Sequence, residues 1–552
     1  MIELSSLPAA WMLLGAYLVA VLGGRARAVV ALLAPLVAGW AAWQLSDGSP
    51  LSVTYLGFTL EPLYADATRR LFATIFCLMA FTGVLFSLYQ SAGRELAAAL
   101  AYAGGALGVC FAGDLFTLFL FWEVMAVFST LLIWNGTGSA ARGAGLRYAV
   151  LHFLGGVVLM TGIIWLWVDS GSLAVRSLEL AGPATWLVLL GVLVNAAAPP
   201  FSAWVADAYP EASPGGSVFL SAFTTKTAVL VLMLLFPGTP ILIGIGLFMV
   251  FYGIVYALLE NDMRRILAYS IVNQVGFMVC AIGIGTEMAL NGAAAHAFAH
   301  IIYKALLLMS AGAVLWRTGR RKCTELGGLY HSMPFTTACG IIGALAISAF
   351  PFTSGFVSKS LTSQAAADLS LTWVWLALTA ASAGVFLHAG IKFPWFVFFQ
   401  RDSGLRPADP PLNMRLAMGL FALLCVGLGC FPDLLYGLLP YPVEYQPYTA
   451  AHLVSQFQLL LFSGLAFFAL LPAMRRTLTI TLDFDWFYRV PLKVLAESVG
   501  RGLSGAGAGI SAGLLWCADR VPPLQRLLPA TAPAGQMILV LLAAFLAALL
   551  LL

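Results

Sequence analysis

One apolar stretch of the chain carries three titratable side chains at a regular spacing. The segment HAFAHIIYKALLLMSAG begins at His296 and also contains His300 and Lys304, so successive titratable residues are four positions apart. Residues at this spacing lie on one face of an α-helix, and these three would extend over about 12 Å along its axis. Histidine titrates closest to neutral pH, and its two ring nitrogens can exchange protons. The spacing therefore predicts a segment of a proton-conducting path.

Two other interpretations of these residues stay open. Two histidines four residues apart can bind zinc, although Lys304 on the same face would repel a cation and no thiol or carboxylate lies nearby in the sequence. The histidines can also be hydrogen-bonded core residues without a role in transport.

Further charged residues fall inside long apolar runs. Glu123 lies in GDLFTLFLFWEVMAVFSTLLIW, and Lys226 and Lys359 lie in two other runs. An ionisable group at membrane depth is costly, so each is expected to face other helices and to pair there. A buried ammonium can lose its proton, whereas a guanidinium keeps its charge, so lysine suits proton transfer. For a single buried charge, a fixed ion pair that joins two helices is the alternative.

The composition indicates a membrane protein. Hydrophobic residues make up 61% of the 552 residues and charged residues only 9%, too few to cover a soluble protein. Apolar runs of about 20 residues recur along the chain, and a helix of that length spans the hydrocarbon core of a bilayer. We expect an all-α polytopic membrane protein with about 16 transmembrane helices. The first run, 7–23, lacks the flanks of a cleavable signal peptide and is expected to be a transmembrane helix.

Charges between the runs predict the orientation of the chain. The predicted spans are 7–23, 28–46, 65–89, 95–112, 114–134, 143–168, 184–205, 216–236, 239–259, 264–285, 288–316, 334–364, 372–400, 412–432, 452–473 and 534–552. Arginines gather in alternate loops and acidic residues in the others, with Arg176 as the clearest exception. Since basic loops stay in the cytoplasm, we expect a plasma (inner) membrane protein with its N- and C-termini on the outer face.

Two predicted spans contain helix-breaking sequences. The seventh includes NAAAPPFSAW, from Asn195 to Trp204, and the twelfth includes SAFPFTSGFVSKS, from Ser348 to Ser360. Proline cannot continue a helix cleanly, and interrupted helices in two oppositely oriented halves are typical of inverted repeats with an ion site at the breaks. The alternative is two ordinary proline kinks.

The segment before the last span has a different character. It contains LDFDWFYRVPLKVLAESVGRGL, in which charged residues alternate with aromatic and aliphatic ones. Such a segment is expected to lie along the cytoplasmic interface or on a partner protein. The expected organisation has six parts. They are helices 1–3 (1–94), helices 4–8 (95–237), helices 9–13 (238–401), helices 14–15 (402–473), the amphipathic segment (474–533) and a last helix (534–552).

The sequence contains no recognisable site for a cofactor or a metal. The eight cysteines are scattered and have no ligand spacing. Neither a dinucleotide-binding nor a phosphate-binding glycine motif is present. We therefore expect no cofactor and no metal, and an enzyme that acts by itself is not expected.

Five motifs of the sequence resemble those of a known family. GDLFTLFLFWEVM, SAFTTKTAV, ENDMRRILAYSIVNQVGFM, HAFAHIIYKALLLMSAGA and FPFTSGFVSKS occur in this order. Together they resemble the antiporter-like subunits of respiratory complex I and of Mrp cation/proton antiporters. The segment SAGVFLHAGIKFPWFVFF and the DFDWFYR tail are most similar to the Mrp D-type subunit. The resemblance implies two inverted five-helix repeats, broken seventh and twelfth helices, and proton transfer along a polar axis at mid-membrane.

The resemblance also implies roles for individual residues. By motif, the implied proton path contains Glu123, Lys226, His300, Lys304 and Lys359, and the four-residue spacing adds His296 to it. The expected supporting positions are Asn195, Ser202, Asn273, His388 and Lys392. One departure matters, because the family usually has a lysine where this chain has Asn195 and often a histidine where it has Ser202. Glu123 therefore lacks its usual partner, so either Lys226 pairs with it or Asn195 binds a cation or water.

The expected function is proton translocation within a multi-subunit assembly. The first hypothesis is a Mrp-type Na⁺ or K⁺/proton antiporter or a related complex I-like complex, with other membrane subunits as partners. A second is a proton-conducting component of a redox-driven, hydrogenase-like or inorganic-carbon-uptake complex. A third is a structural or docking component whose polar axis has lost its function.

Overall fold

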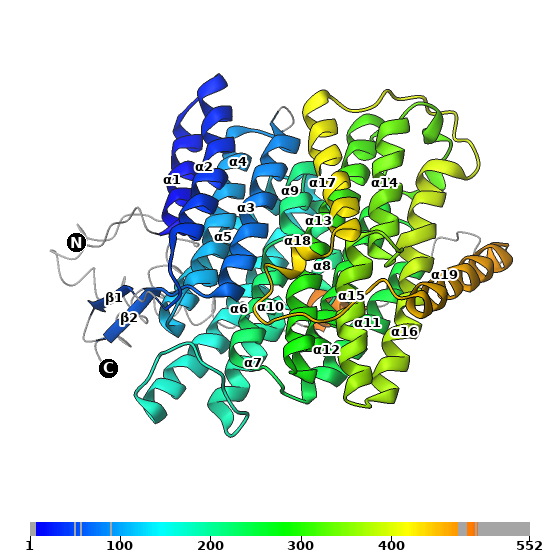
Figure 1. The fold of residues 1–552 in the computed structure, drawn as a ribbon. Helices are drawn as coiled ribbons and strands as arrows, with labels where there is room; N and C mark the ends of the chain where they lie inside the picture. The colour runs from blue at the N-terminus through cyan, green and yellow to red at the C-terminus, as the bar shows by residue number, and fades with distance from the viewer. Residues whose placement is uncertain are drawn as a thin grey trace. The chain divides into compact units, whose positions relative to one another are not determined.

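The computed structural model describes residues 7–48, 51–55, 58–88, 91–472, 483–491 and 494. The chain divides into two units, Met1–Asp485 and Trp486–Leu552. The first unit is a bundle of long, mostly upright helices, with a small β-hairpin at one end (Figure 1). The predicted span 534–552 and most of the amphipathic segment lie outside the described residues.

Most of the first unit is helical, and its elements follow the predicted spans closely. The α-helices are α1 (Pro8–Val21), α2 (Gly24–Gln44), α3 (Ala67–Ser87), α4 (Gly93–Phe111), α5 (Leu115–Trp134), α6 (Gly138–Ser170), α7 (Pro183–Asn195), α8 (Trp204–Ala208), α9 (Pro214–Leu220), α10 (Thr224–Leu235), α11 (Ile241–Leu259), α12 (Met263–Ile284), α13 (Glu287–Thr318), α14 (Pro334–Ile347), α15 (Ser354–Asp368), α16 (Thr372–Val385), α17 (Leu412–Cys430), α18 (Asp433–Tyr436) and α19 (Ala450–Leu470). The other elements are the antiparallel strands β1 (Leu51–Tyr55) and β2 (Phe58–Leu63), three 3₁₀ turns η2 (Tyr209–Glu211), η3 (Cys323–Glu325) and η4 (Leu329–His331), two π-helices η5 (Phe386–Lys392) and η6 (Trp395–Phe399), and the short helix α20 (Asp485–Arg489).

The helices make this a multi-pass membrane protein. Eleven helical segments of the described residues are long and apolar enough to cross a bilayer, and α1, α7 and α14 are shorter apolar helices. Helix is present within every predicted span from 7–23 to 452–473. The prediction of an all-α polytopic fold is confirmed.

Polar residues at helix starts and glycines at helix ends set the helix boundaries. Asp114 accepts a hydrogen bond from the backbone N–H of Thr117, and Asp262 caps α12 in the same way. Gly171 and Gly319 end α6 and α13 in the left-handed conformation that glycine adopts without strain.

Both predicted breaks are present. Helix α7 ends at Asn195 and α8 begins at Trp204, whereas α14 ends at Ile347 and α15 begins at Ser354. A third interruption, between α9 and α10, was not expected from the sequence. Its residues, 221–223, contain neither proline nor glycine, so no strong breaker marks it.

The two breaks share their backbone geometry. Ala197 and Ala349 both have positive φ, at 60° and 56°. The N–H of Ala197 donates to the carbonyl of Val194, and the N–H of Ala349 donates to the carbonyl of Ala346, both over 3.1 Å. A non-glycine residue in this conformation is uncommon, so its recurrence in two matching turns reflects a shared local structure.

The loops after α6 and α13 also repeat each other. An isolated antiparallel bridge joins Asp114 to Ala174, and a second joins Asp262 to Lys322, 148 positions later at both ends. Helix α4 and helix α11 are related by the same offset at both of their ends.

Lys392 lies in the π-helical continuation of α16 and caps another helix. Its Nζ donates to the carbonyl oxygens of Ala257, Leu258 and Glu260 over 2.6, 2.6 and 2.7 Å. These carbonyls belong to the C-terminal end of α11, where a cation is favoured by the helix dipole. Lys392 was expected to be a supporting position of the proton path, and in the structure it caps a helix.

Glycines bring α11 and α12 into close contact. A methyl group on Gly276 would lie 2.6 Å from the carbonyl oxygen of Gly246 and 2.8 Å from the nitrogen of Val250. Both neighbours are backbone atoms, which cannot move aside independently. Small residues at such contacts are the usual means by which membrane helices pack closely.

We expect Gly276→Ala to destabilise the assembled protein by about 1–3 kcal/mol, because it overpacks this contact. The control is Gly244→Ala on the same helix pair, where an added methyl meets nothing within 4 Å. The melting temperature of the purified complex measures both. Equal melting temperatures would contradict the packing argument.

We expect Lys392→Met to lower the melting temperature as well, because three helix-terminal carbonyls lose a charged donor. A hydrogen bond to a charged group contributes about 1.5–3 kcal/mol. Lys322→Met serves as the control, since its side chain is exposed. A Lys392→Met complex as stable as the control would show that the cap does not matter.

Candidate functional site

The three residues of the HAFAHIIYK segment lie in the middle of α13, and all are buried. His296, His300 and Lys304 have 1%, 0% and 0% of their surface exposed. The ring centres of His296 and His300 are 6.3 Å apart, and the Tyr303 ring lies edge-on to His300 at 5.3 Å. The predicted arrangement on one helix is therefore present.

His296 joins three helices through hydrogen bonds. Its Nε2 lies 3.1 Å from Oε1 of Gln274 on α12, and its Nδ1 lies 3.1 Å from Oγ of Ser358 on α15. The hydroxyl of Tyr303 donates to the same Gln274 oxygen over 3.0 Å, and the Gln274 amide donates to Asn273. The result is a continuous polar contact across the interior of the bundle.

Two lysines bind carbonyl oxygens at helix breaks. Nζ of Lys226 donates to the carbonyl of Ser221, over 2.7 Å, at the interruption between α9 and α10. Nζ of Lys359 donates to the carbonyl of Ile347, over 2.6 Å, where α14 ends. Carbonyls at a helix end lack an intrahelical partner and carry partial negative charge, so they stabilise an ammonium group without a full counter-charge.

Lys304 is held differently, by a hydroxyl and a carbonyl of the uninterrupted helix α12. Its Nζ donates to Oγ of Ser270 over 2.8 Å and to the carbonyl of Leu267 over 3.4 Å. Within the described residues, no carboxylate lies within 4.0 Å of Lys226, Lys304 or Lys359. Each ammonium is thus held by neutral oxygens, so losing its proton leaves no unpaired carboxylate behind.

His300 lies on α13, one helical turn before Lys304. A positive charge on His300 would be repelled by positive charges on Lys226, Lys304 and Lys359. Neither of its ring nitrogens has a hydrogen-bond partner among the residues that the structure describes. The fold therefore brings five of the predicted path residues, from α10, α13 and α15, into one cluster, which we call the central cluster: Lys226, His296, His300, Lys304 and Lys359.

Glu123 lies outside the central cluster. On α5, its Oε1 is packed against Gly156 of α6, at a point where any larger residue would collide with it. The described residues form no ion pair between Glu123 and Lys226, and Lys226 is bound to Ser221 and Thr225 instead. The direct pairing considered from the sequence is therefore absent. The physical reason is that the break before α10 supplies a nearer acceptor.

The supporting positions divide into two groups. Oδ1 of Asn195 and Oγ of Ser202, at the α7 break, are buried without a partner in the described residues, as is Nε2 of His388. Asn273 instead donates to the carbonyl of Val250 over 2.8 Å and joins α12 to α11.

Several residues that take part in these contacts were not predicted from the sequence. Ser358 and Tyr303 complete the contacts of His296, and no sequence signal distinguished them from other hydroxyl residues. His152 is a buried histidine on α6, and its offset of 148 from His300 was a detectable signal. Asp483 of the tail segment is also buried and accepts hydrogen bonds of 2.7 Å from the hydroxyls of Tyr252 and Tyr269, rather than facing an interface.

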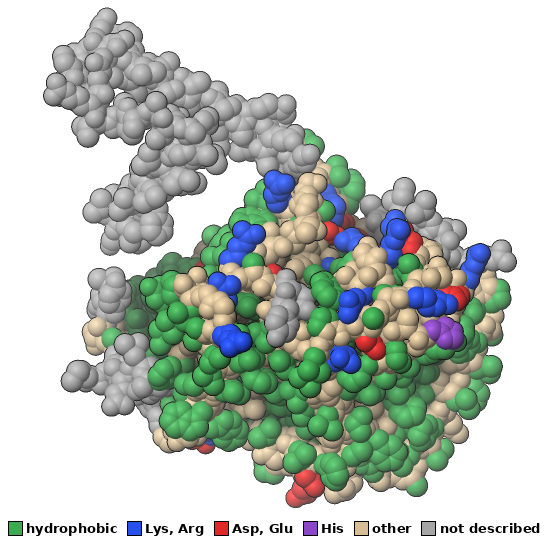
Figure 2. Space-filling model, turned by 90° about the horizontal axis from the view of Figure 1, so that it is seen from above, with side chains coloured by type: hydrophobic (Ala, Val, Ile, Leu, Met, Phe, Trp, Pro, Cys, Tyr) green, Lys and Arg blue, Asp and Glu red, His purple; other side chains and the backbone are tan. Residues whose placement is uncertain are grey.

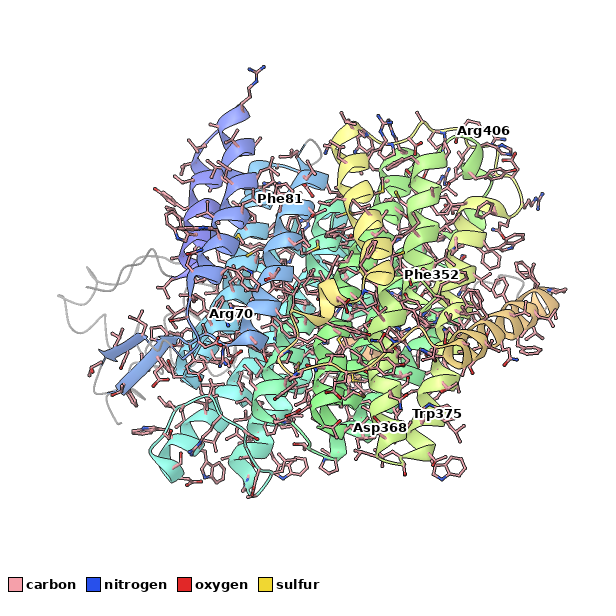
Figure 3. All side chains as sticks on the ribbon, viewed as in Figure 1. Arg70, Phe81, Phe352, Asp368, Trp375 and Arg406 are labelled. Carbon is pink, nitrogen blue, oxygen red and sulfur yellow. The ribbon has the colours of Figure 1, made fainter. Side chains whose placement is uncertain are left out.

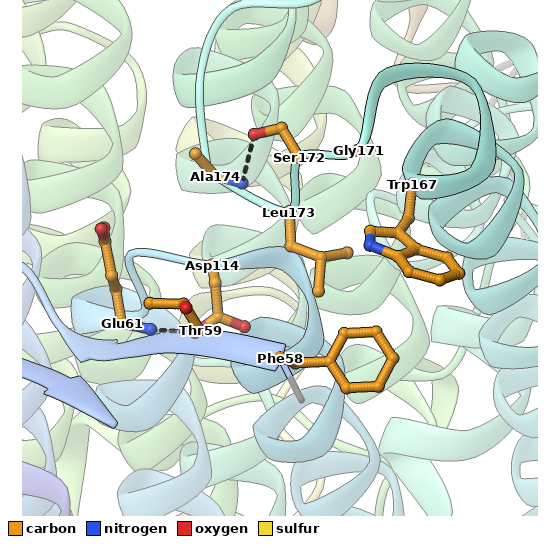
Figure 4. Close-up of a pocket in the computed structure, with 9 residues that line it drawn as sticks. All are labelled: Phe58, Thr59, Glu61, Asp114, Trp167, Gly171, Ser172, Leu173 and Ala174. Carbon is orange, nitrogen blue, oxygen red and sulfur yellow. Dashed lines mark hydrogen bonds between the residues drawn. The ribbon is translucent and has the colours of Figure 1, made fainter. Parts of the chain in front are cut away.

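A pocket near the hairpin is separate from these residues. Its volume is about 340 Å³, and it is lined by the hairpin, the start of α5 and the end of α6 (Figure 4). Both oxygens of its Asp114 are engaged in local hydrogen bonds, to Glu61 and Thr117. In the described part of the chain, no group of three or more His, Cys, Asp or Glu side chains is arranged to hold a metal ion.

Comparison with known proteins agrees with this architecture. Residues 112–384 match the family model described as NADH:quinone oxidoreductase/Mrp antiporter, TM. The chain is 31% identical over 408 residues to the A/B component of a probable K⁺/H⁺ antiporter of Rhizobium meliloti, an alignment that covers 68% of this chain and 40% of that protein. The chain thus spans well under two thirds of that relative's length.

Another relative is matched over most of its own length, and a solved structure shares the fold. The chain is 30% identical over 338 residues to the D-type component of the Na⁺/H⁺ antiporter of Alkalihalophilus pseudofirmus, covering 56% of this chain and 68% of that protein. The structure of the Mrp complex from Dietzia sp. DQ12-45-1b contains a chain that superposes with a TM-score of 0.72 at 21% identity, covering 84% of this chain and 99% of that one. The resemblance noted from the motifs is therefore confirmed, and the chain belongs to the family of membrane subunits shared by NADH:quinone oxidoreductases and Mrp antiporters.

Proposed function

We propose that this protein is the proton-translocating component of a multi-subunit, Mrp-type Na⁺ or K⁺/proton antiporter or a related complex I-like assembly. The observation that supports this most strongly is the central cluster. Three buried lysines and a second buried histidine lie around His300, and neutral oxygens hold the lysines. A set of fixed ion pairs would require carboxylates at these positions.

The central cluster favours stepwise proton transfer. Positive charges at this spacing repel one another inside a medium of low dielectric, so a proton on one lysine favours release from the next. Lys226, Lys304 and Lys359 are the carriers in this scheme, with His296 and His300 between them. Glu123 would exchange protons with the cluster through water. Moving one charge across 100 mV involves about 2.3 kcal/mol, which modest changes in these repulsions can supply.

We infer two inverted five-helix repeats, at 95–237 and 238–401, with broken helices 7 and 12, among 16 transmembrane helices. The 148-residue recurrence of helix ends and bridges, and the matching turns at Ala197 and Ala349, support this arrangement. Residues 1–94 and 402–473 would flank the repeats. The proposed segments 474–533 and 534–552 fall almost wholly outside the described residues.

The arginine-rich face is proposed to face the cytoplasm of a plasma membrane. Figure 2 shows lysine and arginine side chains gathered on the upper face of the bundle. Figure 3 places Arg406 near that end and Asp368 near the opposite end. By the positive-inside rule, the N- and C-termini would then lie on the outer face.

A redox-driven complex is the second candidate. The family model that matches 112–384 covers quinone oxidoreductases as well as antiporters. Identification of the proteins that copurify with this chain separates the two: further small membrane subunits support the antiporter, and cluster- or quinone-binding subunits support the redox complex.

We expect Glu123→Gln and Lys359→Met each to reduce proton transport by the assembled complex at least tenfold. Each change removes a group that can gain and lose a proton. In everted vesicles whose interior has first been acidified, a pH-sensitive dye follows the release of interior protons when NaCl or KCl is added outside, and this measures the effect. For a redox complex, electron donor replaces the salt.

Two exposed residues of the same types, at the start of α13 and in the loop after it, serve as controls. Glu287→Gln and Lys322→Met alter exposed side chains and should leave transport unchanged. If both Glu123→Gln and Lys359→Met complexes assemble and transport at the rate of the controls, the proposed function is wrong.

A further inference from the structure

A second buried histidine lies in the first half of the bundle, on α6. His152 has 1% of its surface exposed. Its ring stacks on Tyr148 at 3.8 Å and meets Trp204 of α8 edge-on at 4.5 Å. The two aromatic contacts fix the plane of the imidazole, so its nitrogens point in defined directions.

Hydrogen bonding determines which nitrogen of His152 is available. Nδ1 lies 2.9 Å from the carbonyl oxygen of Tyr148, which can only accept, so Nδ1 carries a proton in the neutral ring. Nε2 then carries the lone pair. It is buried and has no partner in the described residues. The ring is therefore oriented with one nitrogen ready to accept a proton.

Glu123 of α5 contacts α6 one helical turn from His152, on the face of α6 that carries His152. Its unpartnered Oε1 packs against Gly156, which follows His152 by four residues, about 6 Å along the helix. Gly156 is the position that permits this approach.

Hydroxyl groups beside His152 extend towards α10. The hydroxyl of Tyr148, whose ring stacks on His152, lies 2.9 Å from Oγ of Ser129 and 3.3 Å from Oγ1 of Thr224 at the start of α10. The next residue, Thr225, accepts a 3.0 Å hydrogen bond from Nζ of Lys226 through its own Oγ1. The neighbours of His152 on α6 therefore reach Glu123 through Gly156 and the start of α10 through Tyr148.

The position of His152 in the sequence independently supports a role for it in the proton path. His152 precedes His300 by 148 positions, the offset that also relates Asp114 to Asp262 and Gly171 to Gly319. His152 is therefore the counterpart of the histidine that lies among the lysines of the central cluster.

We propose that His152 is a proton carrier between Glu123 and Lys226. This inference rests on the proposed function. The protonated Glu123 carboxyl gives its proton to Nε2, which leaves a carboxylate and an imidazolium. The imidazolium then gives the Nε2 proton to the neutral Lys226 amine, which becomes an ammonium as the ring returns to its neutral form. Only N–H and O–H bonds change, and water carries the proton across the distance between these groups.

The alternative is that His152 is an aromatic spacer. His152→Phe separates the two roles, because it keeps the stack on Tyr148 and Trp204 and removes both nitrogens. His452→Phe is the control, because His452 also stacks on an aromatic ring, Phe356 at 4.6 Å, and its Nδ1 also lies near a backbone carbonyl, at 2.8 Å. His452 lies on α19 and is not a member of the central cluster.

We expect His152→Phe to reduce proton transport by the assembled complex at least tenfold, with a melting temperature within a few degrees of the wild type, and His452→Phe to have no effect. The assay is the everted-vesicle measurement with NaCl or KCl. If His152→Phe transports within twofold of the wild type while Glu123→Gln does not, the proposal for His152 is overturned and the proposed function stands. If neither variant loses transport, both fail.

A second variant and a spectroscopic measurement cover the case in which His152→Phe does not assemble. His152→Gln keeps a donor for the Tyr148 carbonyl but cannot become an imidazolium, and it should show the same loss. Infrared difference spectra, recorded as transport starts, should contain imidazolium bands that shift with ring-¹⁵N histidine and are weaker in His152→Gln. Undiminished bands in an inactive His152→Gln complex would overturn the proposal.

Discussion

The burial of three lysine side chains inside a helical bundle is the constraint on which the rest of this structure depends. An ammonium group removed from water requires polar contacts, and an intact helix has no free carbonyl to offer, because its own N–H groups use them. The bundle interrupts its helices where lysines 226 and 359 need acceptors, at Ser221 and Ile347. These two lysines can therefore be buried because the helix breaks supply carbonyl acceptors for them.

This arrangement has consequences for packing. The breaks place residues such as Ala197 and Ala349 in a conformation that side-chain-bearing residues rarely adopt, which the surrounding helices must support. Close glycine contacts between α11 and α12 provide part of that rigidity, and Lys392 secures the end of α11. A rigid arrangement of helices can hold the buried lysines close together without pairing them with carboxylates.

Prediction from the sequence succeeded where a signal was local. Proline and its neighbours marked the breaks in α7 and α14, and the four-residue spacing of His296, His300 and Lys304 marked the central face of α13. The break before α10 lacks proline and glycine and was missed, because no residue of the usual helix-breaking types marks it. The pairing of Glu123 with Lys226 was considered and is absent, because choosing a partner requires distances that no spacing supplies.

Composition and periodicity by themselves determined that this chain is a bundle of membrane helices with ionisable groups inside, since apolar run length and the cost of buried charge are properties of the residues alone. The family motifs added which helices carry those groups. Only the tertiary structure decided which atoms meet: that Lys359 binds the end of α14, that His296 joins α12 to α15, and that His152 faces α8 with one nitrogen unpartnered in the described part of the chain. These contacts join residues far apart in the chain, and their geometry depends on how whole helices pack, which no local pattern encodes.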